Sequence, residues 1–268
     1  MNRIAQCLLA GMLLFAQGAS AQAPATVFLE DLTWTELRDR IAAGTTTVLV
    51  PIGGTEQNGP HMALGKHNVR ARLLAGKIAA ALGNAVVAPV LAYAPEGGVN
   101  PPTSHMKFPG TITVSDAAFE AVLESAGRSF KLAGFRDIVF LGDHGGYQKD
   151  LQVAAARLNG EWKDSKVRAH AIIEYYSVVE SAFRAALKER GYGDAEIGTH
   201  AGLADTSLAL AVDPKLVRSE QLQPGTKLTA AEGVYGDPRR ANAELGKIGI
   251  DMIVARTAEA IRKATSSR

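Results

Sequence analysis

The stretch TTTVLVPI at residues 45–52, followed at once by Gly53-Gly54, decides the fold class of this chain of 268 residues. It is apolar and rich in β-branched residues, which is typical of a buried strand, and the two glycines predict a loop where it ends. Further apolar runs predict strands at 85–91, 137–141 and 167–173. Pro89 indicates that the run at 85–91 is an edge strand or the end of a strand.

Helical patterns alternate with these runs. Ser115-Asp116 opens one predicted helix and Gly134 follows it, while Gly83 ends another. Strands that alternate with helices predict a mainly parallel sheet covered by helices on both faces, in a single α/β domain. The predicted helices cover residues 68–82, 116–133, 149–158, 178–190 and 241–263.

The first 21 residues predict a cleaved signal peptide. Met1–Arg3 is a short basic start, Ile4–Phe15 is an apolar run, and Ala19-Ser20-Ala21 is typical of a signal peptidase site. An uncleaved amphipathic anchor is the alternative. Cleavage would leave a mature domain of residues 22–268, periplasmic or secreted, and without the chain's single cysteine, Cys7.

Charge excludes some classes of partner. The formal net charge is +2, with 29 Lys and Arg scattered among 27 Asp and Glu. No basic block is present, so we expect no binding to nucleic acid. After signal cleavage no apolar stretch is long enough for the membrane, and the expected partner is a small-molecule substrate.

Histidines and acidic residues follow two predicted strands. Glu56, His61 and His67 follow the first strand, and Asp143 and His144 follow the third. A single histidine in a loop is usually just solvated, but the carboxyl ends of parallel strands open into one crevice. Imidazole and carboxylate groups together suit zinc, manganese, iron or nickel. The pattern therefore predicts a metal site at this edge of the sheet.

Five motifs in order resemble those of the creatininase (creatinine amidohydrolase) family. The family patterns include G-S-x-E-Q-H-G-P-H-L-P-L and H-A-G-x-x-E-T-S. Each motif is weak alone, but together they span nearly all of the mature chain. The matching segments are GGTEQNGPHMAL (53–64), FPGTIT (108–113), LGDHGG (141–146), HAGLADTS (200–207) and GVYGDP (233–238).

The resemblance implies a three-layer α/β/α domain, a metal centre that usually holds two ions, and commonly a homo-oligomer, a hexamer. It also implies hydrolysis of a C–N bond, often in a cyclic amide. The predicted activity is therefore that of a metal-dependent amidohydrolase that uses metal-activated water. The alternatives are a non-catalytic periplasmic carrier of small molecules and an ester or lactone hydrolase.

Individual residues depart from the family's metal motif. Glu56 and His144 fall on family ligands, whereas Asn58 stands at a ligand histidine and His67 at a metal-bridging aspartate. A neutral imidazole offers one lone pair and does not bridge two ions as a carboxylate does. The predicted ligands are Glu56, His67 and His144, with Asp205 as a fourth ligand or as a residue that orients a histidine. One zinc or manganese ion is favoured over two.

The remaining roles concern protons and substrate. His200 is predicted to carry a proton to the leaving nitrogen, because imidazole titrates near neutral pH, and it is grouped with Glu56 as catalytic. Four residues in or near the motifs are predicted to contact substrate. These are Asn58, His61, His105 and Tyr147.

Overall fold

A parallel sheet forms the centre of the protein. The computed structural model describes residues 25–266; the predicted signal peptide lies outside them. The strand order is β2-β1-β3-β4, and every pair is parallel. This confirms the predicted α/β class with a parallel sheet. The strands are β1 (Thr47–Ile52), β2 (Ala85–Val87), β3 (Asp137–Gly142) and β4 (Arg168–Ala171).

The strand β2 is shorter than its apolar run. It ends at Val87, two residues before Pro89, and it lies at the edge of the sheet. Proline has no N–H to donate to a neighbouring strand, so β2 ends before Pro89.

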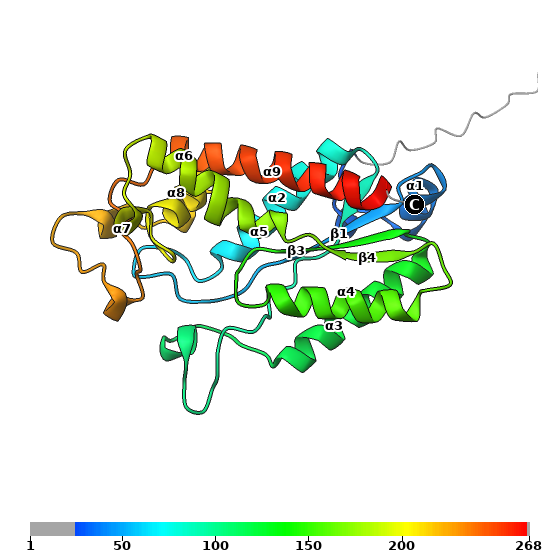
Figure 1. Cartoon of the computed structure of the whole chain (residues 1–268), viewed down its shortest axis with the longest axis horizontal. Helices are drawn as coiled ribbons and strands as arrows, with labels where there is room; N and C mark the ends of the chain where they lie inside the picture. The colour runs from blue at the N-terminus through cyan, green and yellow to red at the C-terminus, as the bar shows by residue number, and fades with distance from the viewer. Residues whose placement is uncertain (1–24, 267–268) are drawn as a thin grey trace, which may run out of the picture.

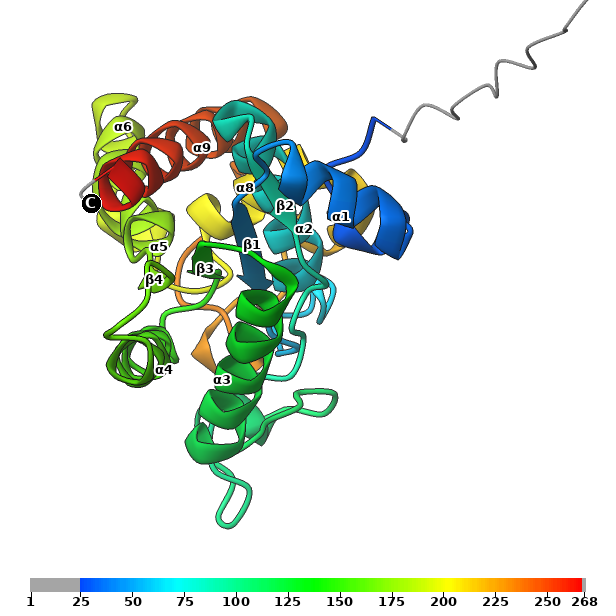
Figure 2. The same cartoon turned by 90° about the vertical axis from the view of Figure 1, so that its right-hand side faces the viewer.

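Helices cover both faces of the sheet (Figure 1). One face packs against α2, α5, α8 and α9, and the other against α3 and α4. Figure 2 shows the sheet between these two layers. The helices are α1 (Trp34–Ala42), α2 (Lys66–Leu82), α3 (Asp116–Ala133), α4 (Gln148–Glu161), α5 (Glu174–Val178), α6 (Arg184–Glu189), α7 (Asp194–Ile197), α8 (Leu203–Val212) and α9 (Ala243–Ser266).

Local chemistry sets both ends of α3. The Ser115 side chain accepts a hydrogen bond from Ala118 N at the start of α3, and Gly134 follows its end with φ +106°. A residue without a Cβ adopts that left-handed conformation at little cost. Helix α5 continues through a π-helical turn, Val179–Phe183, into α6, so this helix begins four residues earlier than predicted.

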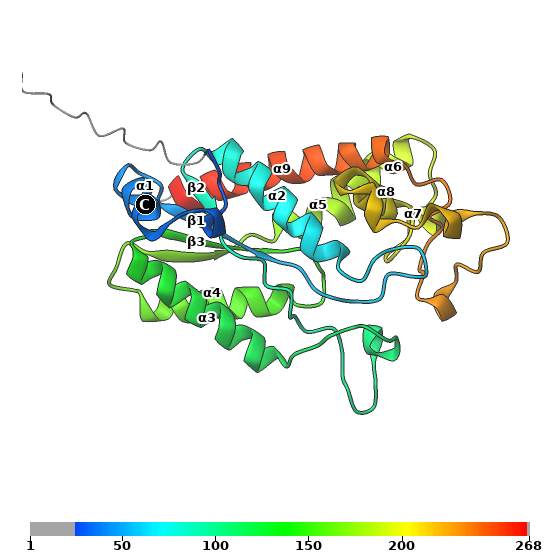
Figure 3. The same cartoon turned by 180° about the vertical axis from the view of Figure 1, so that it is seen from behind.

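The carboxyl ends of the strands all lie at one end of the sheet, because the strands are parallel. The loops that leave them extend in the same direction, together with the segment between α8 and α9 (Figure 3). This end therefore gathers the loops in which the sequence concentrates its histidines. Among residues 25–266, no helix combines the length and the apolar character needed to cross a membrane.

Candidate metal centre

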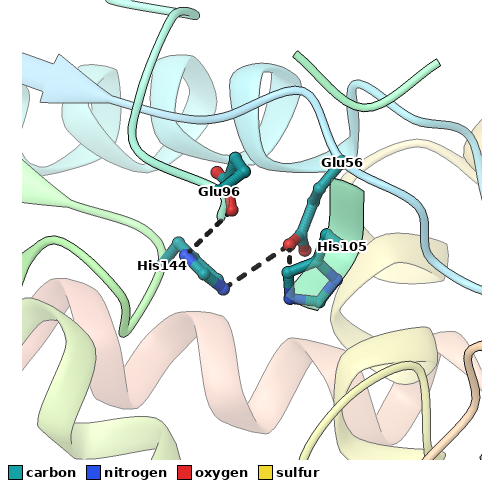
Figure 4. Close-up of side chains that lie close together, drawn as sticks. All are labelled: Glu56, Glu96, His105 and His144. Atoms are coloured by element: carbon teal, nitrogen blue, oxygen red, sulfur yellow. Dashed lines mark ion pairs between the residues drawn. The ribbon is translucent and has the colours of Figure 1, made fainter. Parts of the chain in front are cut away.

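Four buried or half-buried side chains converge where the strands end (Figure 4). Glu56 follows β1 and His144 follows β3, while Glu96 and His105 come from the long loop after β2. One ligand atom from each of the four lies within 4.8 Å of the other three. We call Glu56, Glu96, His105 and His144 the four-residue group.

Glu56 is at the centre of the four-residue group. Its Oε2 lies 3.1 Å from His105 Nε2 and 3.5 Å from His144 Nε2. The other nitrogen of His144, Nδ1, is 3.4 Å from Glu96 Oε2. Glu56 is 0% exposed and Glu96 is 2% exposed. Glu56 Oε2 and both carboxylate oxygens of Glu96 are buried without a hydrogen bond. Buried carboxylate oxygens without donors are costly, and a cation among them would remove that cost.

Burial sets the protonation states of the group. It raises the pKa of Glu96 to about 9, with a further contribution from the charge of Glu56. Burial also lowers the pKa of His144 to about 3, and it lowers the pKa of His105. For Glu56 the effect of burial is outweighed by His67 and His144, which hold its pKa well below the usual value. The two imidazoles are thus neutral at pH 7 and keep lone pairs for an ion.

The loop that carries His105 is tied to the loop after β1. Thr111 Oγ1 donates to the His105 carbonyl at 2.9 Å and accepts from Gln57 N at 3.1 Å. Gly54 stands beside Glu96, and a Cβ on Gly54 would lie 2.4 Å from Glu96 Oε1. The glycine therefore makes room for the Glu96 carboxylate.

His67 lies beside the group, between two carboxylates. Its Nε2 is 2.8 Å from Glu56 Oε1, and its Nδ1 is 2.6 Å from Asp143 Oδ2. Asp143 also accepts hydrogen bonds from Arg70 Nε and the Tyr175 hydroxyl, each at 2.8 Å. Both ring nitrogens of His67 therefore face hydrogen-bonding partners, and the residue is not part of the four-residue group.

Asp205, on α8, lies against two buried cations of α2. Its Oδ2 is 2.6 Å from Lys66 Nζ, and its Oδ1 is 3.1 Å from Arg70 Nη1. Lys66 is 1% exposed and Arg70 is 5% exposed. Burial alone would raise the pKa of Asp205, but Lys66 and Arg70 hold it well below the usual value. Both oxygens of Asp205 thus have partners outside the four-residue group.

His200 lies at the edge of the group. Its Nδ1 is 3.8 Å from Glu56 Oε1, and its ring centroid is 4.6 Å from that of His105. Its Nε2 faces the Gln57 carbonyl at 3.0 Å. Burial and the charge of Lys66 lower the pKa of His200 to about 4, so the ring is neutral at pH 7.

Three residues predicted to contact substrate are fully buried: Asn58, His61 and Tyr147. Asn58 Nδ2 donates to the Glu56 carbonyl at 2.9 Å, and His61 Nε2 lies 3.0 Å from Thr206 Oγ1. The Tyr147 hydroxyl accepts from the N–H groups of residues 143 and 144 at 3.1 Å each. All three side chains make their contacts within the protein interior, and none lines the two cavities described next.

Two cavities adjoin the group. An inner chamber of about 70 Å³ is lined by His67 of α2, by His144 after β3, and by residues of α5 and α8 that include Asp205. An outer cleft of about 620 Å³ lies on the other side of Thr199 and His200. Thr199 and His200 line both, so they form part of the wall between them. The outer cleft is lined by Gln57, Ser104, His105, Lys107, Phe108, Thr199, His200, Ala230, Ala231 and Tyr235.

Sequence reasoning did not single out Glu96. It is the one acidic residue between Tyr93 and Thr113, in a segment rich in proline and glycine. The sequence signal that could have identified Glu96 is that it is an isolated carboxylate in the same loop as His105. Lys66 and Arg70 were also missed, although they flank His67 at the start of a helix.

The chain is similar to proteins of one known family. The family model described as "Creatininase: Creatinine amidohydrolase" matches residues 30–261. The mycofactocin precursor peptide peptidase of Mycolicibacterium smegmatis is 32% identical over 221 residues, which cover 75% of this chain and 78% of that protein. Creatinine amidohydrolase of Pseudomonas putida is 27% identical over 268 residues, covering 89% and 97%.

Solved structures share the fold. A crystal structure of creatininase superposes with a TM-score of 0.75 at 24% identity, covering 91% of this chain and all of that one. A creatininase structure with manganese gives a TM-score of 0.73 at 25% identity, covering 89% and 98%. A mutant creatininase of Zn–Zn type gives 0.72 at 25% identity, covering 90% and 99%.

Proposed function

The chain belongs to the creatininase family, whose characterised relatives are hydrolases, and on that premise we propose that it hydrolyses a C–N bond of an amide with one divalent metal ion. The observation that carries the proposal is the four-residue group, with its buried carboxylate oxygens that lack donors. A carrier of small molecules would not need this donor set.

The donor set fits zinc or manganese. Glu56 and Glu96 would supply carboxylate oxygens, and His105 and His144 would supply neutral imidazole nitrogens. Two carboxylates and two imidazoles suit both metals. A divalent ion in this place would polarise the amide carbonyl and activate water for attack.

The count of charges supports one ion. Four carboxylates surround the site: Glu56, Glu96, Asp143 and Asp205. They meet two permanent cations, Lys66 and Arg70. Once Glu96 has released its proton upon the binding of an ion, four negative charges against two positive charges leave two, which one divalent ion balances. A second ion would add two uncompensated positive charges in a buried place, at high energetic cost.

His200 is suited to move the proton. It is neutral at pH 7, lines both cavities and lies next to Glu56 and His105. In this proposal its free ring nitrogen takes a proton from the attacking water and passes it to the leaving nitrogen. Asp205 forms ion pairs with Lys66 and Arg70. The hydrogen bonds of Asn58, His61 and Tyr147 hold the loops of the site in place. His67 orients Glu56.

We also propose export. The N-terminal pattern supports cleavage after Ala21 and a periplasmic or secreted mature protein. N-terminal sequencing of exported protein should find Gln22 first. For assembly, the family resemblance supports a homo-oligomer, and light scattering of the purified protein should report about six copies.

Metal analysis tests the proposal. The purified full chain should retain near one zinc or manganese per copy, and Glu96→Gln should lose it because a neutral amide binds these ions weakly. Thermal unfolding of both proteins after chelation should be similar, which separates lost metal from lost fold. Two ions per copy would contradict the single-ion proposal. Full metal retention by Glu96→Gln would contradict the assignment of Glu96.

A further inference from the structure

Of the two cavities, the outer cleft has the volume to admit a substrate to the site. The inner chamber of about 70 Å³ is far below the volume of roughly 300–1,000 Å³ that small-molecule sites need. The outer cleft, at about 620 Å³, lies within that range and includes His105 of the four-residue group. The residues that line the outer cleft therefore select the part of the substrate beyond the scissile bond.

One permanent charge faces this cleft. Among its described lining residues, Lys107 is the only Lys, Arg, Asp or Glu. Within residues 25–266 its ammonium group has no carboxylate partner and no hydrogen bond. The inner cations Lys66 and Arg70, by contrast, are both paired with carboxylates. An unpaired cation in a cleft beside a charge-balanced metal site is free to bind an anion from outside.

Lys107 is mounted on the same short helix as a residue of the four-residue group. The 3-10 helix Ser104–Lys107 carries His105, and Ser104 adopts a left-handed φ of +48°. Thr111 Oγ1 and Phe108 N both donate to the His105 carbonyl, at 2.9 and 3.1 Å. This short helix therefore fixes the backbone of Lys107 relative to His105, and so relative to the reacting bond.

The other walls of the cleft are aromatic or small. Tyr235 is 53% exposed, and its ring centroid is 6.5 Å from that of His200. Phe108 is half-buried, and Ala230 and Ala231 add two short side chains. These surfaces suit an apolar or aromatic group, and they offer no second cation.

Resting on the proposed amide hydrolysis, we propose that the substrate carries a carboxylate a few bonds from the scissile amide and that Lys107 binds this carboxylate. Acids such as N-acyl amino acids fit this description, whereas a neutral cyclic amide does not. In the reaction, water adds its oxygen to the carbonyl carbon and the C–N bond breaks. One proton of that water goes to the leaving nitrogen, so the products are a carboxylic acid and an amine.

Two matched pairs of amides test the proposal with the full chain loaded with zinc or manganese. N-Benzoylglycine is compared with N-(2-hydroxyethyl)benzamide, and N-phenylsuccinamic acid with N-phenylbutanamide. Each pair has the same type of scissile bond and differs in the carboxylate. The acid of at least one pair should react with the lower KM. Lys107→Met should raise that KM about tenfold, the loss expected for one charge-assisted contact, with little change in kcat.

Controls separate the charge of Lys107 from other effects. Lys107→Arg should retain most of the preference for the acid, and Lys163→Met, an exposed lysine in the turn before β4, should change nothing. Neutral amides that react as well as their acids, or an unchanged KM in Lys107→Met, would overturn the role of Lys107 while amide hydrolysis stands. No hydrolysis of either pair or of the neutral ring amide dihydrouracil would overturn the proposed function itself.

Discussion

Asp205→Asn separates a structural ion pair from a metal ligand. The substitution keeps the size of the side chain and removes its charge. Asp205 Oδ2 is 2.6 Å from Lys66 Nζ, and Asp205 is the only carboxylate within ion-pair distance of Lys66 among residues 25–266. Arg70 keeps a second partner, Asp143, at 2.8 Å. The main consequence is therefore a buried ammonium group without a counter-charge.

The expected loss of stability follows from burial. Removal of one partner of a buried ion pair costs about 3–5 kcal/mol. The Asp205 side chain is 18% exposed, so water can reach it in part, and we expect the low end, about 3 kcal/mol. In a domain of this size, each kcal/mol shifts the unfolding temperature by roughly 2–4 °C. The variant should therefore unfold about 6–12 °C lower than the wild type.

Two measurements on one preparation decide the matter. Thermal unfolding after chelation should show the drop, while metal analysis before chelation should still find near one ion per chain. Asp251→Asn is the control, because its pair with Lys247 is exposed and contributes little. A variant that loses its metal but unfolds at the wild-type temperature would refute the reasoning, and Asp205 would then be a ligand.

Two further predictions concern Glu96. Because its pKa is raised to about 9, the carboxyl is protonated in the ion-free protein at pH 7, and binding of one ion should release about one proton. Calorimetry in two buffers of different ionisation enthalpy measures this number, and metal affinity should rise about tenfold per pH unit between pH 6 and 8. Gly54→Ala should weaken metal binding about tenfold or more, because the new Cβ would lie 2.4 Å from Glu96 Oε1. Gly44→Ala, at φ +109° with nothing within 4 Å, carries similar backbone strain without that contact and should leave affinity unchanged.

The sheet was predictable because its central strands, β1 and β3, are buried along their whole length. A continuous apolar run such as residues 47–52 has little alternative to a central strand, and Pro89 limits the next strand for a local reason. The helix α8 was not predicted. Its N-cap is Gly202, without a capping side chain, and the motif at residues 200–207 overlaps its first residues. A missing cap is not the whole reason, because α1 has a capping box between Thr33 and Glu36 and was also not predicted.

The site was predictable only where the fold dictates it. Glu56 and His144 follow adjacent parallel strands, so topology alone brings them together. Glu96 reaches the same point through a long loop whose path depends on contacts such as that between Thr111 and Gln57. The pairing of Asp205 with Lys66 joins two helices 139 residues apart in sequence, and no spacing rule reveals it.

The two departures from the family motif are consistent with a donor set that has moved within the site. Asn58 directs its amide nitrogen to the carbonyls of Glu56 and Ala63, at 2.9 and 3.3 Å, and so secures the loop that carries Glu56. His67 has both ring nitrogens against hydrogen-bonding partners, one of them Glu56 itself. Next to α2, the positive charge comes from the side chains of Lys66 and Arg70. Unlike a metal ion, these groups need no ligands.

On the opposite side, the loop after β2 contributes one carboxylate and one imidazole that the sequence motif does not mark, Glu96 and His105. A single ion held there would lie next to the outer cleft, since His105 belongs to both the four-residue group and the cleft wall. The same arrangement underlies our two proposals, that one ion binds and that substrate meets it from the side of Lys107. Both conclusions depend on Glu96, which makes the Glu96→Gln metal analysis the most informative single experiment.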